Sequence, residues 1–174
     1  QAKRLNDYNV DELVYIDITR NNKYDLGRDD LFIKSQKDII SIIKNISKVC
    51  FMPLTFGGGI KTVTDAVNRI RAGADKITIN SLLFTDLNVV KKIISEIGSQ
   101  AVVASIDYKE INNKLKIFKH FGQEETNLNL IDFIKKIEDL GVGEFFIQNI
   151  KLDGMQKGFD INNIKKVVKS VNIP

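Results

Sequence analysis

The stretch Pro53-Leu54-Thr55-Phe56-Gly57-Gly58-Gly59-Ile60-Lys61-Thr62 decides how the rest of the sequence is interpreted. A short apolar run breaks into three glycines and then opens a helical pattern, which predicts a strand, a loop and a helix. Consecutive glycines let the backbone adopt positive φ and bring N–H groups against an anion, and the dipole of the following helix adds to the attraction. The stretch is thus a candidate phosphate-binding loop, although glycines between strand and helix often form only a tight turn.

A second strand with a polar end follows about one strand-helix unit later. The segment Ile77-Thr78-Ile79-Asn80-Ser81 is apolar at first and ends in two hydrogen-bonding side chains. In a parallel barrel, the carboxyl ends of the strands face the same mouth, so these side chains would supply a second pair of donors to the same phosphate. The two segments together favour phosphate binding over a simple turn.

The composition is that of a globular protein with one sizeable core. The chain has 174 residues, of which 43% are hydrophobic and 28% are charged. Its single cysteine, Cys50, forms no internal disulfide, no apolar run approaches the ~20 residues of a membrane span, and no signal-peptide pattern is present. We therefore expect a cytoplasmic protein without membrane contact, and we expect neither a metal ion nor an organic cofactor.

The formal charge of +4 and the isoelectric point near 9.0 raise the question of nucleic-acid binding. The lysines are spread over separate predicted helices, which is typical of solvated faces and not of a binding patch. We therefore expect no nucleic-acid partner. A mild positive field instead favours a phosphorylated small-molecule substrate.

Strand and helix patterns alternate along the chain. Buried strands are predicted at residues 13–18, 50–56, 76–79, 101–107 and 144–148, and helices at residues 1–9, 35–47, 63–72, 87–97, 129–140 and 160–171. Polar loops are predicted at residues 21–30 and 149–158, and a hairpin at residues 109–121. This alternation indicates a parallel α/β fold. An open doubly wound sheet fits the strand count, whereas a closed (β/α)₈ barrel typically needs ~250 residues. Because the pattern runs up to both ends, we expect part of a longer barrel.

Six segments follow one another in a characteristic order, at residues 11–19, 56–60, 73–80, 98–103, 143–144 and 153–160. Together they resemble HisF, the cyclase subunit of imidazole glycerol phosphate synthase. The resemblance implies a TIM barrel, with residues 1–174 as a single partial domain that carries strands two to six. The segment at residues 50–62 is most similar to the HisF-like branch associated with glycosyl amidation in surface-polysaccharide biosynthesis.

Asp107 ends a predicted strand and matches one of the two catalytic aspartates of the HisF family. The resemblance places the other aspartate on the family's first strand. The implied reaction adds ammonia to an imine-like carbon, expels an amine and closes a ring, so protons must be both taken and given. Two carboxylates with separated pKa values can share that work. The residues alone also allow an aspartate that only caps the following hairpin.

The resemblance implies two phosphate sites, one for each end of the substrate. The first is matched by Gly58, Gly59, Asn80 and Ser81, and a contributor to the second is matched by Gly154. Asp153 stands beside Gly154 and is expected to orient substrate or ammonia. An Asp-Gly pair is equally typical of a turn.

Glu12, Lys76 and Glu144 each stand at the start of a predicted strand. By the resemblance they match residues of a charged ring at the barrel floor, where ammonia enters from a glutaminase subunit similar to HisH. Asp75 and its surroundings would then dock that partner. Charges at the bottom face of a barrel usually serve stability, so the prediction of an ammonia gate depends on the match of all three.

The sequence departs from the family pattern at Gln148, Asn149, Lys151 and Met155. These positions line the expected mouth, so they leave the substrate open. The first hypothesis is the histidine-pathway cyclase, a lyase that acts on the phosphoribosyl precursor of imidazole glycerol phosphate. Three alternatives remain: an ammonia-channelling subunit in amidation of an acetamido sugar, a sugar-phosphate isomerase of histidine synthesis, and a non-catalytic barrel that binds a phosphorylated metabolite.

Overall fold

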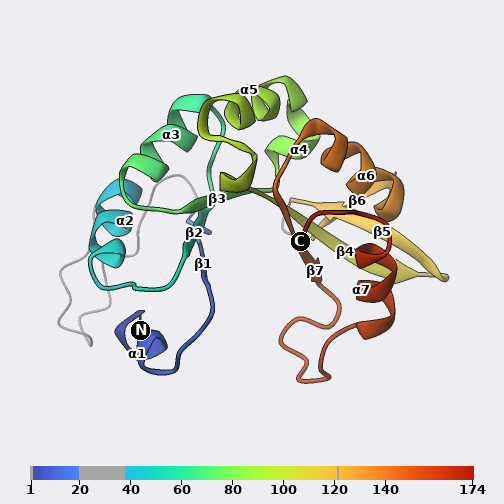
Figure 1. The fold of residues 1–174 in the computed structure, drawn as a ribbon. Coiled ribbons are helices and arrows are strands. Elements are labelled where there is room, and N and C mark those ends of the chain that lie inside the picture. Colours follow the sequence, from blue (N-terminus) through green and yellow to red (C-terminus); the bar gives the residue numbers. More distant parts are fainter. Residues whose placement is uncertain (1, 20–37, 121) are drawn as a thin grey trace. The chain divides into compact units, whose positions relative to one another are not determined.

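The computed structural model describes residues 2–19, 38–120 and 122–174. They form two compact units, Gln1–Ile77 and Thr78–Pro174, and the division falls within strand β3, Lys76–Ile79. Figure 1 shows the elements of each unit in sequence colours. The predicted loop at residues 21–30 and the first three residues of the helix predicted at 35–47 lie outside the described residues.

The first unit begins with a short helix and then alternates strands with helices. Its elements before β3 are α1 (Ala2–Asp7), β1 (Leu13–Ile16), α2 (Ile39–Ser47), β2 (Leu54–Gly57) and α3 (Val63–Arg71). Strands β1 and β2 are parallel, with Leu13 opposite Leu54 and Ile16 opposite Gly57. A helix between two parallel strands is the expected crossover, so the predicted parallel α/β pattern is confirmed here.

The core of the first unit lies between helix α2 and strand β2. Ile43 and Phe56 are fully buried, and the isoleucine stripe of α2 packs against the same cluster. The Tyr15 ring stacks on Phe56 with 4.9 Å between ring centroids. The helical spacing of the isoleucines therefore serves core packing, as such a stripe usually does.

The second unit continues the alternation and contains an antiparallel insertion. After β3 it consists of α4 (Leu82–Thr85), α5 (Leu87–Ile97), a 3₁₀ turn (Ser99–Ala101), β4 (Val102–Ile111), β5 (Lys114–Lys119), β6 (Glu124–Asn129), α6 (Leu130–Leu140), β7 (Glu144–Asn149) and α7 (Ile161–Val168). Strands β4 and β7 are parallel, with Val103 opposite Glu144 and Asp107 opposite Gln148. Apolar residues of β4, α5 and α6 are fully buried and form the core.

The hairpin predicted at residues 109–121 is present, but it is larger than predicted. Strand β4 continues past Asp107 to Ile111 and turns at Asn112 and Asn113, which both have positive φ, into the antiparallel strand β5. Asparagine tolerates this left-handed conformation better than most residues. Strand β6 then pairs with β5, and α6 lies beside both (Figure 1). The sequence analysis did not predict β6 or the single-turn helix α4.

Helix ends in the second unit follow side-chain capping. Asp86 accepts hydrogen bonds from Asn88 N and Val89 N at the start of α5, and Asn129 accepts one from Ile131 N, so α6 begins at Leu130 and not at the predicted Asn129. Among the described residues, no helix has the length and apolar character needed to cross a bilayer.

Candidate functional site

The triple-glycine loop follows β2 directly and depends on glycine at its second position. Gly58 has a φ of 96°, and a Cβ atom there would lie 2.1 Å from the main-chain oxygen of Asp17, which follows β1. The Asp17 amide also donates to the Gly57 carbonyl over 2.9 Å. The two strand ends are thus in such close contact that no side chain fits at Gly58.

Helix α3 starts after the loop with a complete capping box. The Thr62 hydroxyl accepts from Asp65 N, and the Asp65 carboxylate accepts from Thr62 N and Lys61 N. Burial alone would raise the pKa of Asp65, but these hydrogen bonds and the charge of Arg69 lower it. Asp65 is therefore ionised at neutral pH and holds the first turn of the helix behind the loop.

In the second unit, Asp107 lies on β4 beside the end of β7 and is partly buried. The Asn80 side-chain amide donates a hydrogen bond of 3.3 Å to Asp107 Oδ2. Asn80 directly follows β3, so the polar residue after this strand contacts a carboxylate within β4. The sequence analysis assigned Asn80 to phosphate and did not predict this contact.

The surroundings of Asp107 favour its protonated form more than water does. Burial raises the pKa of Asp107, the hydrogen bond from Asn80 lowers it, and the negative charge of Asp153 raises it further, with a net shift upward. A carboxyl group with a raised pKa is nearer to the neutral range, where it can both accept and give a proton.

Two residues that depart from the HisF pattern organise the loop after β7. Gln148 Nε2 donates to Asp153 Oδ2 over 3.0 Å, and Asn149 Nδ2 donates to Asp160 Oδ2 over 2.7 Å. Gln148 stands opposite Asp107 on the neighbouring strand and hydrogen-bonds to Asp153. It therefore connects the strand position of Asp107 with the carboxylate of Asp153. Gly154, next to Asp153, is exposed and has positive φ. Both departures therefore fix the position of the loop that carries Asp153.

A buried tyrosine extends this arrangement. The Tyr108 hydroxyl donates to Asp160 Oδ2 over 2.9 Å, and Asn163 Nδ2 donates to the same oxygen over 2.9 Å. Burial and the Asp160 carboxylate raise the pKa of Tyr108 far above its usual value, so it remains a donor. Burial acts to raise the pKa of Asp160, but the three donor side chains lower it. The sequence analysis missed this network because its members lie up to 55 positions apart and share no motif.

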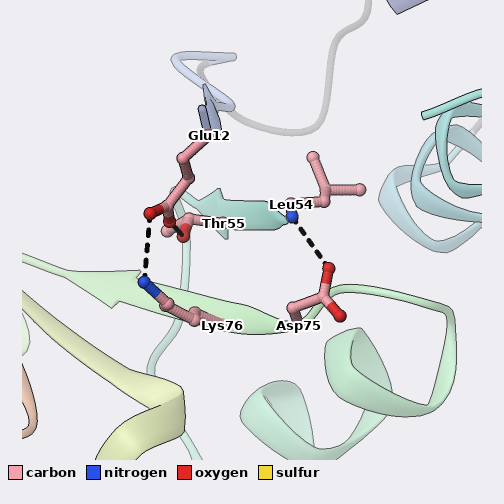
Figure 2. Close-up of polar contacts among 5 residues, drawn as sticks. All are labelled: Glu12, Leu54, Thr55, Asp75 and Lys76. Carbon is pink, nitrogen blue, oxygen red and sulfur yellow. Dashed lines mark hydrogen bonds and ion pairs between the residues drawn. The ribbon is translucent and has the colours of Figure 1, made fainter. Parts of the chain in front are cut away.

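In the first unit, Lys76 Nζ lies 3.0 Å from Glu12 Oε2, and the Thr55 hydroxyl hydrogen-bonds to the other carboxylate oxygen. Figure 2 shows these contacts, together with the hydrogen bond of 2.8 Å that the Leu54 amide donates to the Asp75 carboxylate. Two of the three predicted gate residues are therefore an ion pair. Glu144 belongs to the second unit, where it opens β7 and is partly buried.

The predicted phosphate-binding residues are divided between the units. Gly58 and Gly59 follow β2 in the first unit, whereas Asn80 and Ser81 follow β3 in the second. Ser81 is exposed and precedes α4, and its carbonyl accepts a hydrogen bond from the Thr85 hydroxyl. Each pair therefore stands at a strand end, as the sequence analysis predicted.

Parallel strands joined by helices, with polar side chains near their carboxyl ends, are consistent with the TIM-barrel class. Enzymes of this class carry their chemistry at those strand ends. The chain belongs to the histidine biosynthesis protein family, whose family model matches residues 1–174. The predicted resemblance to HisF is confirmed.

Curated relatives carry the name imidazole glycerol phosphate synthase subunit HisF. The relative from Saccharolobus solfataricus is 39% identical over 165 residues, which cover 95% of this chain and 61% of the relative. Those from Sulfurisphaera tokodaii and Petrotoga mobilis are each 35% identical, over 99% of this chain and 65% of the relative. The chain thus spans less than two thirds of the length of these relatives.

Proposed function

We propose that this chain is part of a HisF-type cyclase, which uses ammonia to convert a phosphoribosyl precursor into imidazole glycerol phosphate in histidine biosynthesis. The observation that carries the proposal is the position of Asp107: it lies on β4 opposite Gln148 near the end of β7, receives a hydrogen bond from Asn80 and has a raised pKa. The family match over residues 1–174 supports it.

In this proposal Asp107 exchanges protons with the reacting nitrogen atoms. Its carboxylate takes a proton from the incoming ammonia as the nitrogen bonds to carbon, and the resulting carboxylic acid returns one to the departing amine. A raised pKa suits this exchange because it brings the protonated form of Asp107 closer to the pH at which the carboxylate also exists. The second aspartate implied by the resemblance would act on the other face of the reacting group. Asn80 would keep the Asp107 carboxylate in its place.

The substrate's two phosphate ends would bind at the two sites that the resemblance to HisF implies. Gly58 and Gly59 would offer backbone N–H groups, with Asn80 and Ser81 as side-chain donors to the same phosphate. Gly154 would contact the other phosphate, and Asp153, held by Gln148, would orient substrate or ammonia.

Ammonia would come from a glutaminase subunit similar to HisH. The ion pair between Glu12 and Lys76, together with Glu144, would form the gate through which ammonia enters, and the surface around Asp75 would dock the partner. The relatives are named as a subunit of a synthase, which supports an assembly of more than one chain.

Turnover by the full-length gene product tests the proposal. With ammonium as nitrogen source, we expect it to convert the phosphoribosyl precursor to imidazole glycerol phosphate, measured by product formation. A folded protein that gives no turnover contradicts the cyclase. The next substrate is then a nucleotide-activated acetamido sugar with the partner subunits present, because Gln148 and Asn149 alter the mouth relative to the family pattern.

A further inference from the structure

Arg69 is a charged residue in the interior of the first unit. It lies on α3 and is only 5% exposed. Arginine is rarely buried to this extent unless its guanidinium is hydrogen-bonded, because removing the charge from water is costly. Its surroundings therefore indicate a specific task.

The guanidinium joins the triple-glycine loop to the helix behind it. Arg69 Nη2 donates to the Gly58 carbonyl over 2.7 Å, and Nη1 donates to the Asp65 carbonyl over 3.0 Å. The planar fork of an arginine can hold two acceptors in fixed directions, which a lysine cannot do. Arg69 thus fixes the direction of one carbonyl in the loop relative to the first turn of α3.

Fixing the Gly58 carbonyl also fixes the next N–H group. The Gly58 carbonyl and the Gly59 N–H belong to one planar trans peptide, in which C=O and N–H point in opposite directions. Because the carbonyl points to the buried guanidinium, the Gly59 N–H points away from it. Gly59 is exposed, and its φ of 64° follows one of 96° at Gly58, so the peptide has a conformation that few other residues would hold.

The charge of Arg69 is balanced close by, which limits its action at long range. Asp65 feels the charge of Arg69, which contributes to its lowered pKa, and stays ionised. The effect of Arg69 on a bound anion should therefore come mainly from the direction of the peptide. Arg71 is an exposed arginine on the same helix. Its replacement removes the same charge as replacement of Arg69 but leaves the contacts of Arg69 in place.

We propose that Arg69 is a positioning residue that aims the Gly59 N–H at a phosphate group of the substrate. This inference rests on the proposed role of Gly58 and Gly59 in phosphate binding, and it adds a residue outside the glycine motif itself. Replacement of Arg69 by an apolar residue would leave the Gly58 carbonyl without this donor and free the peptide to rotate.

The test compares the full-length wild-type protein with Arg69→Met, Arg69→Lys and Arg71→Met. Each is titrated with inorganic phosphate while the backbone amide of Gly59 is followed by NMR, and KM and kcat are measured with the phosphoribosyl precursor. We expect Arg69→Met to weaken phosphate binding about tenfold or more and to raise KM more than it lowers kcat. Arg69→Lys should lie between Arg69→Met and wild type, and Arg71→Met should stay within about twofold of wild type.

The outcomes separate the inference from the function on which it rests. If wild type binds phosphate with a shift of the Gly59 amide and Arg69→Met binds equally well, the inference is wrong and the phosphate site stands. Equal losses in Arg69→Met and Arg71→Met would also overturn it, because net charge would then explain both.

If wild type turns over the precursor but phosphate leaves the Gly59 amide unchanged, the loop is not the phosphate site, and the inference fails while the cyclase stands. If Arg69→Met fails to fold by circular dichroism, Arg69→Lys decides: wild-type binding in that variant contradicts the inference.

Discussion

The side-chain amide of Asn80 donates a hydrogen bond of 3.3 Å to Asp107 Oδ2, which joins the end of β3 to the carboxylate on β4. This bond lowers the pKa of Asp107, whereas burial and the charge of Asp153 raise it, and the net shift is upward. The protonation of the proposed catalytic residue therefore depends on two neighbours that can be changed one at a time.

Asn80→Ala should raise the pKa of Asp107 further, because it removes the bond that favours the charged form. If turnover needs the ionised carboxylate of Asp107, kcat falls as the pH drops through the pKa of this group. A higher pKa should therefore move the acidic limb of the kcat profile to higher pH. Asp153→Asn removes a repulsive charge and should move the limb to lower pH. The measurement is the pH dependence of kcat in both variants. Limbs that coincide with that of wild type would show that neither neighbour sets this pKa.

Gly58→Ala should destabilise the fold strongly, because its Cβ would overlap the Asp17 main chain and its φ is positive. We expect a loss of about 2–4 kcal/mol in the free energy of unfolding, measured by urea denaturation. Gly154→Ala is the matched control, since its φ of 70° is also positive but no atom lies within 4 Å of the added Cβ. It should cost only about 1 kcal/mol. Similar losses in the two variants would contradict the close contact at Asp17.

Tyr108→Phe should destabilise the protein by about 1–2 kcal/mol, because it removes a buried donor to the Asp160 carboxylate. Urea denaturation of the variant measures this loss. Tyr8→Phe, at a residue that is 69% exposed, should change stability by less than about 0.5 kcal/mol. A Tyr108→Phe protein as stable as wild type would show that the remaining donors to Asp160 suffice.

Lys76→Ala should separate the two nitrogen sources. The ion pair with Glu12 is partly exposed, so its loss should cost at most about 1 kcal/mol of stability. If the pair belongs to an ammonia gate, turnover with glutamine and the partner subunit should fall several-fold, while turnover with free ammonium should stay near that of wild type. Steady-state assays with both sources measure this. Equal loss with both would rule out the gate.

Patterns within single elements were readily predicted from the sequence. Helix α5 has the predicted bounds, Leu87–Ile97, because its apolar stripe is regular and Gly98 follows it. The five predicted strands were found from their apolar runs, but β1, predicted as buried, has Val14, Tyr15 and Ile16 exposed, and β7 is only partly buried. Strand β6 was missed because its residues, Glu-Glu-Thr-Asn-Leu-Asn, are mostly exposed and are extended through pairing with β5. Tertiary pairing thus overrides a weak local preference.

Contacts between elements account for most of what the sequence did not reveal about the candidate site. Asp107, Asn80 and Asp153 were each selected as site residues, but the bond between the first two depends on which strand ends are neighbours. The roles of Gln148 and Arg69 depend on partners across a turn or behind a loop. Motif spacing indicates which residue types are present, whereas the packing of strands and helices decides which of them meet.

Asp107 is the proposed acid–base residue, and one comparison tests its role directly. Full-length wild type, Asp107→Asn and the exposed control Asp139→Asn are compared in turnover of the phosphoribosyl precursor at saturating ammonium. We predict that Asp107→Asn lowers kcat by about 10²–10⁴-fold, the range expected for loss of a general acid–base group, while Asp139→Asn retains wild-type turnover. An Asp107→Asn protein that is folded and turns over the precursor at the wild-type rate would contradict the proposed role.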